Sequence, residues 1–541
     1  MKRCLKTLLP VLLPAVIFAF TMGAQDVLHL NFTQPGGFPG HPVMTGIYRT
    51  NNSVTLTWDG PSGYYQLYQT TNLLSRYWEA VGGPNLNRNA TLTNPPDQVF
   101  FKVLGPAAQY AGSLACAGCH RAIYNNQMET GHAHAWTPLE IIHQDKNPAC
   151  IVCHAVGYGL PTGFTSLADT RHLANVQCEN CHGPAASHAA NPRDLSRRPR
   201  AEIAGQVCGG CHNSSEGPFY SEWKASGHAT VVEDLSSPGL INNCGRCHSG
   251  TVRLALVHGA DPSDIPVTLA NDANVGLTCV VCHDPHAKQT WTNVLTGTAF
   301  TNQLRYPLTS TNYISVTSGT TFTNRLDINV CAQCHNDFGA NWAGTRPPHH
   351  SPQYNMLMGT VGLLPAAGAA PIFINSATNA NPATHALYVE KQCVTCHMQT
   401  TPFVDEEHPA QAGHTFKADR VDICQKCHAV PDRLNHFNAA VATRIEQLKV
   451  ALNQWAATRA PAALREQYGL LAWEFSIPGT LSSGVAGPTA AEQALIPARI
   501  KYARFNLYVA AYDGSLGTHN PMHIAALLDA ADAWVQAELS Q

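Results

Sequence analysis

Cys116-Ala-Gly-Cys-His120 is the first of nine Cys-x-x-Cys-His segments in this chain of 541 residues. The frequencies of cysteine and histidine, at 19 and 27 residues, predict only about 0.03 such segments by chance. The nine segments use every cysteine except Cys4. They are Cys116/Cys119/His120, Cys150/Cys153/His154, Cys178/Cys181/His182, Cys208/Cys211/His212, Cys244/Cys247/His248, Cys279/Cys282/His283, Cys331/Cys334/His335, Cys393/Cys396/His397 and Cys424/Cys427/His428.

This spacing is typical of covalent haem attachment. Two thiols three positions apart on one helical turn can each add to one vinyl group of a haem, and the adjacent histidine then binds the iron as its proximal ligand. Zinc sites explain paired cysteines but not a histidine after every second cysteine. A disulfide framework leaves the histidines unexplained as well. The sequence therefore predicts nine c-type haems, numbered 1 to 9 below in chain order.

Composition excludes other classes of function. The chain is 44% hydrophobic, which is ordinary for a globular protein. Its 33 lysines and arginines nearly balance its 36 aspartates and glutamates, and only 13% of the residues are charged. No basic surface for a nucleic-acid partner is indicated.

The first 24 residues have the build of a secretory signal peptide. Basic residues precede an apolar run at 8–20, and small residues follow up to Ala24. A membrane anchor is the alternative, but the run is short and contains two prolines. We expect cleavage near Ala24, loss of Cys4, and a mature protein without a stable membrane span in the periplasm, outside the cell or at its surface.

Three regions follow the predicted signal peptide. Residues 28–107 alternate apolar and polar side chains, as in Ser53-Val-Thr-Leu-Thr-Trp58, and predict a small antiparallel β-sandwich-like module that resembles fibronectin-III or immunoglobulin-like modules. Residues 108–436 carry the nine segments, which start 28 to 62 residues apart. This region should be mostly α, with extensive coil packed around stacked c-type haems.

The last region, 437–541, predicts a C-terminal helical bundle that closes the haem domain. Helical periodicity runs through 438–457 and 490–512. Pro521 fits the first turn of a last helix that ends near Leu539.

A family resemblance is specific in the haem region. Tyr220-Ser-Glu-Trp-Lys-Ala-Ser-Gly-His228 resembles the Tyr-x-x-Trp-x-x-Ser-x-His pattern of the cytochrome c-552/c-554 family of multihaem cytochromes, and 124–132 is a weaker copy. The tail Asp513-Gly-Ser-Leu-Gly-Thr-His-Asn-Pro521 is similar to that of hydroxylamine oxidoreductase and pentahaem nitrite reductase. Nine haems exceed the four, five or eight of those relatives, so no relative's haem layout can be transferred whole.

The resemblance implies distal iron ligands from histidines outside the nine segments. Those whose position matches the relatives are His132, His188, His228, His286 and His519. Among the other spare histidines, the distal candidates are His349, His385 and His414. His172, His258 and His350 are weaker candidates, and His350 competes with His349 for one site. His134, His143, His408, His436 and His523 are expected at the surface or behind a ligand.

Two functions remain open. If every iron has two histidine ligands, the chain conducts electrons between redox partner proteins or quinone-linked membrane complexes. If one haem is open, the chain is an oxidoreductase for a small nitrogen or sulfur compound such as hydroxylamine, nitrite or tetrathionate. Abundant spare histidines and the lack of a Cys-x-x-Cys-Lys segment favour the conductor over an enzyme. The sequence identifies no catalytic residue and leaves homo-oligomers open.

Overall fold

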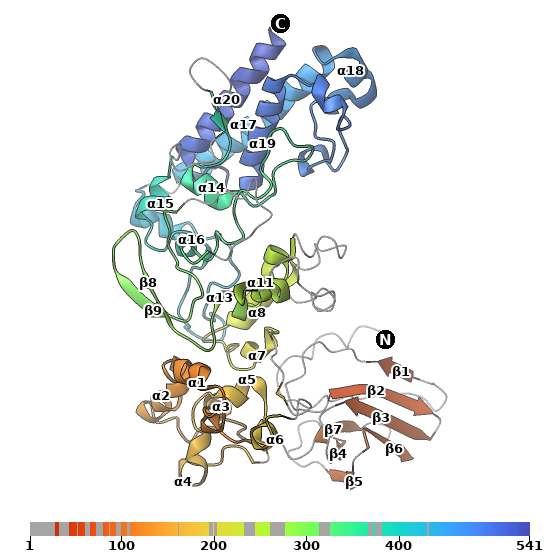
Figure 1. Ribbon diagram of the computed structural model, residues 1–541, viewed down its shortest axis with the longest axis vertical. Coiled ribbons are helices and arrows are strands. Elements are labelled where there is room, and N and C mark those ends of the chain that lie inside the picture. The colour runs from red at the N-terminus through yellow and green to blue at the C-terminus, as the bar shows by residue number, and fades with distance from the viewer. Residues whose placement is uncertain are drawn as a thin grey trace. The chain divides into compact units, whose positions relative to one another are not determined.

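The structure is a computed structural model, shown in Figure 1. It describes residues 28–31, 43–50, 52–59, 65–71, 79–85, 87–93, 99–104, 109–160, 162–193, 198–199, 203–231, 244–259, 276–312, 325–365, 372–373, 381–429 and 432–541. The predicted signal peptide at 1–24 lies outside these residues. Contacts divide the chain into two compact units. Unit 1 contains 1–214, 278–280 and 284–288, and unit 2 contains 215–277, 281–283 and 289–541.

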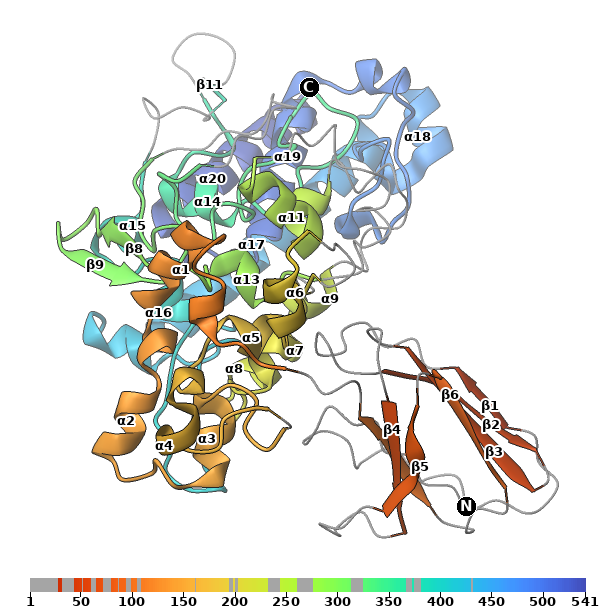
Figure 2. The ribbon, with the colours of Figure 1, turned by 60° about the horizontal axis from the view of Figure 1, so that its bottom comes forward.

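Two antiparallel sheets form the N-terminal part of unit 1 (Figure 2). The order is β1-β2-β3-β6 in one sheet and β5-β4-β7 in the other. Alternate apolar side chains of both sheets share one core, including Ile47, Leu56, Trp58, Leu67 and Val103. The strands are β1 (Leu28–Asn31), β2 (Val43–Thr50), β3 (Ser53–Asp59), β4 (Tyr65–Thr70), β5 (Glu79–Asn85), β6 (Asn89–Thr93) and β7 (Phe100–Leu104).

Short helices joined by coil carry the haem segments. They are α1 (Arg121–Met128), α2 (Trp136–Ile141), α3 (Pro148–His154), α4 (Leu167–Thr170), α5 (Cys178–His182), α6 (Ala186–Ala190), α7 (Gln206–Gly209), α8 (Phe219–Lys224), α9 (Gly227–Thr230), α11 (Gly250–Val257), α13 (Cys279–Cys282), α14 (Gln353–Met358), α15 (Thr384–Tyr388) and α16 (Cys393–His397). Two small hairpins join β8 (Gln289–Thr292) with β9 (Ala299–Asn302) and β10 (Leu363–Leu364) with β11 (Ile372–Phe373).

Local sequence explains where some of these helices begin. The side chain of Asn147 accepts a hydrogen bond from the backbone of Ala149, and Pro148 occupies the first turn of α3. A reciprocal pair of side chain to backbone hydrogen bonds from Gln177 and Asn180 caps α5. Both helices contain a haem segment, so these caps fix the segment's turn.

The C-terminal part of unit 2 is a helical bundle of α17 (Asp432–Thr458), α18 (Ala462–Tyr468), α19 (Ala498–Asp513) and α20 (Pro521–Leu539). In Figures 1 and 2, α17, α19 and α20 lie side by side. Their core includes Leu448, Trp455, Phe505 and Leu528, together with Val361 from the haem region. The last helix has the predicted bounds.

One predicted helix is shorter than expected. Helical periodicity suggested 490–512, but the structure has a short 3₁₀ turn at Glu492–Leu495 before α19 begins at Ala498. Pro497 separates the two, because proline lacks the backbone N–H that a helix interior needs and disfavours a helical residue before it. The prediction of a mostly helical chain with small antiparallel sheets is otherwise confirmed. Within the described ranges, no helix is both long and apolar enough to cross a bilayer.

Candidate haem-binding sites

Most of the haem segments can place their two thiols and their imidazole on one turn of backbone. In four segments the histidine N–H donates to the carbonyl of the first cysteine, four residues earlier. These bonds are His120 to Cys116 (2.9 Å), His212 to Cys208 (2.9 Å), His335 to Cys331 (2.9 Å) and His428 to Cys424 (2.8 Å). In α3, α5 and α16 the whole segment lies in a helix. This geometry suits two thioether bonds and one iron ligand on the same haem.

Segment 6 departs from the expected geometry at its histidine. Helix α13 contains Cys279 and Cys282 but ends before His283, which instead forms an antiparallel bridge with Leu304. Next to this bridge, the backbone N–H of Arg305 donates to the carbonyl of Cys282 at 2.9 Å. The two thiols of segment 6 thus share one helical turn, whereas pairing with another stretch of backbone replaces the helix at His283.

Several predicted haem-binding residues are exposed in the polypeptide. The polypeptide does not enclose Cys119, His120, Cys211, His212, His283, Cys427 and His428. This exposure has a physical reason. A haem reaches its two thiols and its iron ligand from one side of the segment, so protein atoms cannot cover that side. The porphyrin is then the apolar surface that would shield Cys119, His283 and Cys427 from water.

Six of the nine predicted proximal histidines lie opposite a second imidazole. The pairs, with the distance between ring centroids, are His132 and His212 (6.0 Å), His182 and His286 (6.0 Å), His228 and His335 (6.2 Å), His248 and His349 (5.9 Å), His385 and His428 (6.1 Å), and His397 and His519 (6.2 Å). Each pair joins one segment histidine to one distal candidate.

These distances fit a metal between the rings. A bond from metal to imidazole nitrogen is about 2 Å, and the ring centroid lies about 1 Å behind that nitrogen, so two imidazoles on opposite sides of one iron have centroids about 6 Å apart. All six pairs agree with this value. The residues present therefore fit haem iron with two histidine ligands.

Hydrogen bonds at Nδ1 orient several of these rings. His385 bonds through Nδ1 to the carbonyl of Thr518 (2.9 Å), and His397 to that of Phe416 (3.1 Å). The Nδ1 atoms of His335 and His349 lie 3.2 Å from Gln353 Oε1 and 2.9 Å from Ser351 Oγ. A carbonyl can only accept, so Nδ1 carries the proton and Nε2 keeps a free lone pair for a metal.

Burial keeps several candidate ligands in the form that binds metal. It lowers the pKa of His132, with a further contribution from His212. It also lowers the pKa of His228 to about 4 and that of His349 to about 3. These imidazoles are therefore neutral at pH 7, and only a neutral imidazole nitrogen can bind iron.

His519 has a different environment. Its Nδ1 lies 2.7 Å from Oδ1 of Asp513, whose side chain is fully buried. Burial alone would lower the pKa of His519, but the charge and hydrogen bond of Asp513 outweigh it, so the pKa is raised. Sequence reasoning found His519 through its tail motif but missed the role of Asp513.

Thiols of different segments contact each other within each unit. In unit 1, close approaches of the thiols join Cys116 with Cys178, Cys153 with Cys211, and Cys208 with Cys279. In unit 2 they join Cys247 with Cys334 and Cys331 with Cys393. The contact with Cys178 raises the pKa of Cys116, and that with Cys211 lowers the pKa of Cys153 to about 7. Segments far apart in sequence are thus brought together in pairs.

Two distal candidates are not opposite a segment histidine. His414 bonds through Nδ1 to the carbonyl of Ala412 (2.9 Å), and its ring packs on Phe219. His188 has a buried Nδ1 with no hydrogen-bond partner among the described residues. Within the same residues, neither His120 nor His154 has a second imidazole at the distance seen in the six pairs.

The other spare histidines lie in different surroundings. His350 stacks on His349 at 4.2 Å and lies 6.4 Å from His248, so both histidines lie near the same segment histidine. His408 is exposed and bonds to Asp405. His523 was expected at the surface or behind a ligand, and the surface alternative is wrong because the side chain is fully buried against the carbonyl of Val361.

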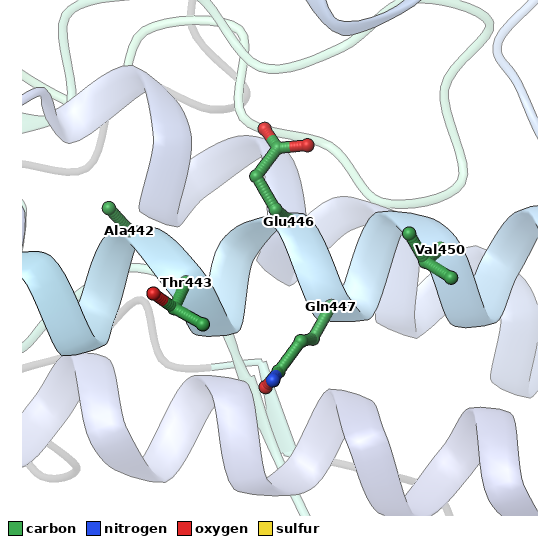
Figure 3. Close-up of a pocket in the computed structure, with 5 residues that line it drawn as sticks. All are labelled: Ala442, Thr443, Glu446, Gln447 and Val450. Carbon is green, nitrogen blue, oxygen red and sulfur yellow. The ribbon is translucent and has the colours of Figure 1, made fainter.

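A hollow on the bundle lies outside this array. Figure 3 shows that Ala442, Thr443, Glu446, Gln447 and Val450 line it from α17 alone. It contains no haem-segment residue and neither a thiol nor an imidazole, so it is not part of the candidate site.

Two family descriptions match the haem region. Residues 115–183 match the cytochrome c554 and c-prime family, and 165–249 match the family of cytochrome c7 and related cytochromes c. Cytochrome c-554 of Nitrosomonas europaea is 28% identical in a match of 156 residues that covers 23% of this chain and 64% of that relative. The chain thus spans less than two thirds of that relative's length.

Two solved structures show partial similarity to this chain. The outer cell wall cytochrome OcwA has 18% identity and a TM-score of 0.46, with 79% of this chain and all of that chain covered. An undecahaem cytochrome from the S-layer of Carboxydothermus ferrireducens has 17% identity and a TM-score of 0.43, with 91% of this chain and 62% of that chain covered.

Proposed function

The chain is a multihaem c-type cytochrome that resembles cytochrome c-554, and we propose that it conducts electrons through nine covalently bound haems, mainly with two histidine ligands each. The observation that carries this proposal is the set of six imidazole pairs with ring centroids 5.9 to 6.2 Å apart. An iron with two imidazole ligands has no position for a substrate. Its remaining chemistry is to gain and lose one electron.

The pairs suggest the ligand of each haem. His286 serves haem 3, His132 haem 4, His349 haem 5, His228 haem 7, His519 haem 8 and His385 haem 9. In this assignment His414, with its Nδ1 occupied, serves haem 6 within unit 2, and His188 serves haem 1 or haem 2 within unit 1. When bound, each haem supplies a one-electron centre, and the protein holds the imidazoles that keep both oxidation states coordinated.

Contacts between thiols support short steps from haem to haem. The cysteines are the covalent anchors of the porphyrin, so touching cysteines place two porphyrin edges side by side. In unit 1 these contacts join segment 1 with 3, 2 with 4, and 4 with the first cysteine of 6. In unit 2 they join segment 7 with both 5 and 8. Each contact would allow an electron to pass directly between the haems that it joins.

The proposal also covers the cellular location of the protein and the roles of its regions. Covalent haem and the signal-like residues 1–24 favour export to the periplasm or cell surface, with redox proteins or quinone-linked complexes as partners. Residues 28–107 would form a docking or spacer module, 108–436 the haem domain and 437–541 the bundle that closes it.

A second function is favoured by one observation. Eight distal candidates serve nine haems, and among the described residues His120 and His154 have no opposing imidazole. Haem 1 or haem 2 would then be open in the alternative, and the chain would reduce or oxidise a small nitrogen or sulfur compound there.

Carbon monoxide separates the two functions, because it binds ferrous haem only where a ligand position is open. The dithionite-reduced holoprotein should bind it negligibly if the chain is a conductor. A Soret shift amounting to one haem in nine would favour the oxidoreductase. Turnover with hydroxylamine, nitrite and tetrathionate would then identify the substrate class.

A further inference from the structure

His519 lies in the turn that joins α19 to α20. Asp513 is the last residue of α19, and the side chain of Asn520 caps α20. Gly517 has φ +90°, and a Cβ there would meet the ring of Phe437 at 2.7 Å, so only glycine fits this turn. The turn is therefore built to hold one conformation around His519.

The carboxylate of Asp513 is fully buried and accepts hydrogen bonds at both oxygens. Oδ1 accepts from Nδ1 of His519 at 2.7 Å, and Oδ2 accepts from the Ser515 hydroxyl. Ser515 Oγ also accepts the backbone N–H of His519 at 3.1 Å. A buried carboxylate is costly unless it is paired and hydrogen-bonded, so this arrangement is a built contact rather than a chance one.

No other histidine of the six pairs with a described Nδ1 partner has a carboxylate there. His385 and His397 bond to backbone carbonyls, His335 to a glutamine amide and His349 to a serine hydroxyl. Another contact between Nδ1 and a carboxylate, His408 with Asp405, is exposed at the surface.

A carboxylate behind a metal-bound imidazole changes the metal. It draws the Nδ1 proton toward itself, and the ring becomes a stronger donor to the iron. Its negative charge, with little solvent to screen it, also favours the ferric over the ferrous ion. Hydrogen bonding behind the ligand and burial are two of the levers that set haem potentials.

We propose that Asp513 is a positioning residue that lowers the reduction potential of haem 8, the haem bound by Cys393, Cys396 and His397. This inference rests on the proposed ligation of haem 8 by His519. Cys393 contacts Cys331 of segment 7, and Cys396 is close enough to Cys424 of segment 9 for the two thiols to influence each other. Haem 8 thus lies next to segments 7 and 9 in unit 2, where a change in its potential would affect electron transfer to its neighbours.

The test is Asp513→Asn in the full-length holoprotein, followed by potentiometric titration with optical and EPR detection. One haem in nine should move to higher potential, and the g values of one low-spin ferric haem should change. All nine haems should remain attached, and no haem should change its spin state. Asp405→Asn is the matched control and should move no haem.

Two further variants keep the proposal falsifiable. Ser515→Ala removes a hydrogen bond that competes for the carboxylate, so the same haem should move to lower potential. His519→Ala tests the ligation separately, because one haem becomes high-spin if His519 binds iron. If His519→Ala gives that change but Asp513→Asn moves no haem, Asp513 does not set the potential. If His519→Ala stays wholly low-spin, the ligation itself is wrong.

Discussion

His519 and His523 stand one helical turn apart and use their ring nitrogens in opposite ways. His519 bonds through Nδ1 to Asp513, which leaves Nε2 free. His523 donates through Nε2 to the carbonyl of Val361 at 2.7 Å. Because a carbonyl only accepts, Nε2 of His523 carries a proton and cannot bind a metal. A histidine whose hydrogen bond is at Nδ1 can thus bind a metal through Nε2, whereas one whose hydrogen bond is at Nε2 has a structural role.

His519→Ala should leave nine covalent haems and convert one of them from low-spin to high-spin. The alanine leaves one iron with a single imidazole, so carbon monoxide binding should rise to about one haem and peroxidase-like activity should appear. EPR and optical spectra of the purified variant measure this change.

His523→Ala is the control for that variant. It removes a buried hydrogen bond and should cost about 1 to 3 kcal/mol of stability, but it should leave the spin state unchanged. If His519→Ala stays wholly low-spin, the tail does not supply a ligand.

Residue roles differ in how far sequence predicts them. The nine segments are local, so spacing alone predicts thiols and proximal histidines, but it did not predict that the helix of segment 6 ends before His283. His132, His228, His286 and His519 were suggested by resemblance, and their placement opposite segment histidines depends on tertiary structure. The carbonyls that orient His385 and His397 have no sequence signal, because every residue has a carbonyl.

At the scale of elements, the helices of the bundle were well predicted from sequence. The polar contacts buried inside the bundle were not. Apolar periodicity predicted α17 and most of α19, and Pro521 indicated the start of α20. However, α19 is buried on nearly all sides and includes charged and polar residues. Arg504 donates to the carbonyls of Trp473 and Glu474, and its pKa falls to about 9 because it is buried. Tyr508 donates to the Glu474 carboxylate at 2.6 Å. Periodicity cannot reveal such a network, because its members come from separate segments.

Glu474 should make stability depend on pH. Burial raises its pKa, so the folded state holds the proton more tightly than the unfolded state. Stability should be highest below the unfolded value of about 4.3 and should fall as pH rises through the higher folded pKa. Denaturant unfolding between pH 4 and 7 measures this slope. Glu474→Gln should flatten the dependence of stability on pH. An unchanged pH dependence in this variant would mean that other groups cause it.

At the scale of the whole chain, apolar side chains are concentrated away from the haem segments. The bundle core contains large side chains such as Trp455, Trp473 and Phe475, whereas the core around segment 2 is limited to a few residues near Trp136 and Ile151. Ordering so much coil needs a compensating apolar contact. Porphyrin can provide that contact. The haem segments, and not the hydropathy of the side chains, therefore predicted that this region folds.

The number of bound haems can be measured, because folding of this region depends on haem. Intact-mass measurement of the exported protein should show nine covalent haems and no free thiol. Expression in the cytoplasm, where haem is not attached, should give an unfolded chain. Chelators should not unfold the exported protein, in contrast to a zinc protein. A mass with eight or fewer haems would mean that at least one segment is structural.

Quantitative EPR of the fully oxidised holoprotein tests the central claim most directly. Iron with two histidine ligands is low-spin, whereas iron with an open position gives a high-spin signal. The six imidazole pairs predict at least six low-spin haems, and conduction through all nine predicts that high-spin iron is negligible. A high-spin signal from four or more haems would contradict the account, because the paired histidines would then not be bound to iron.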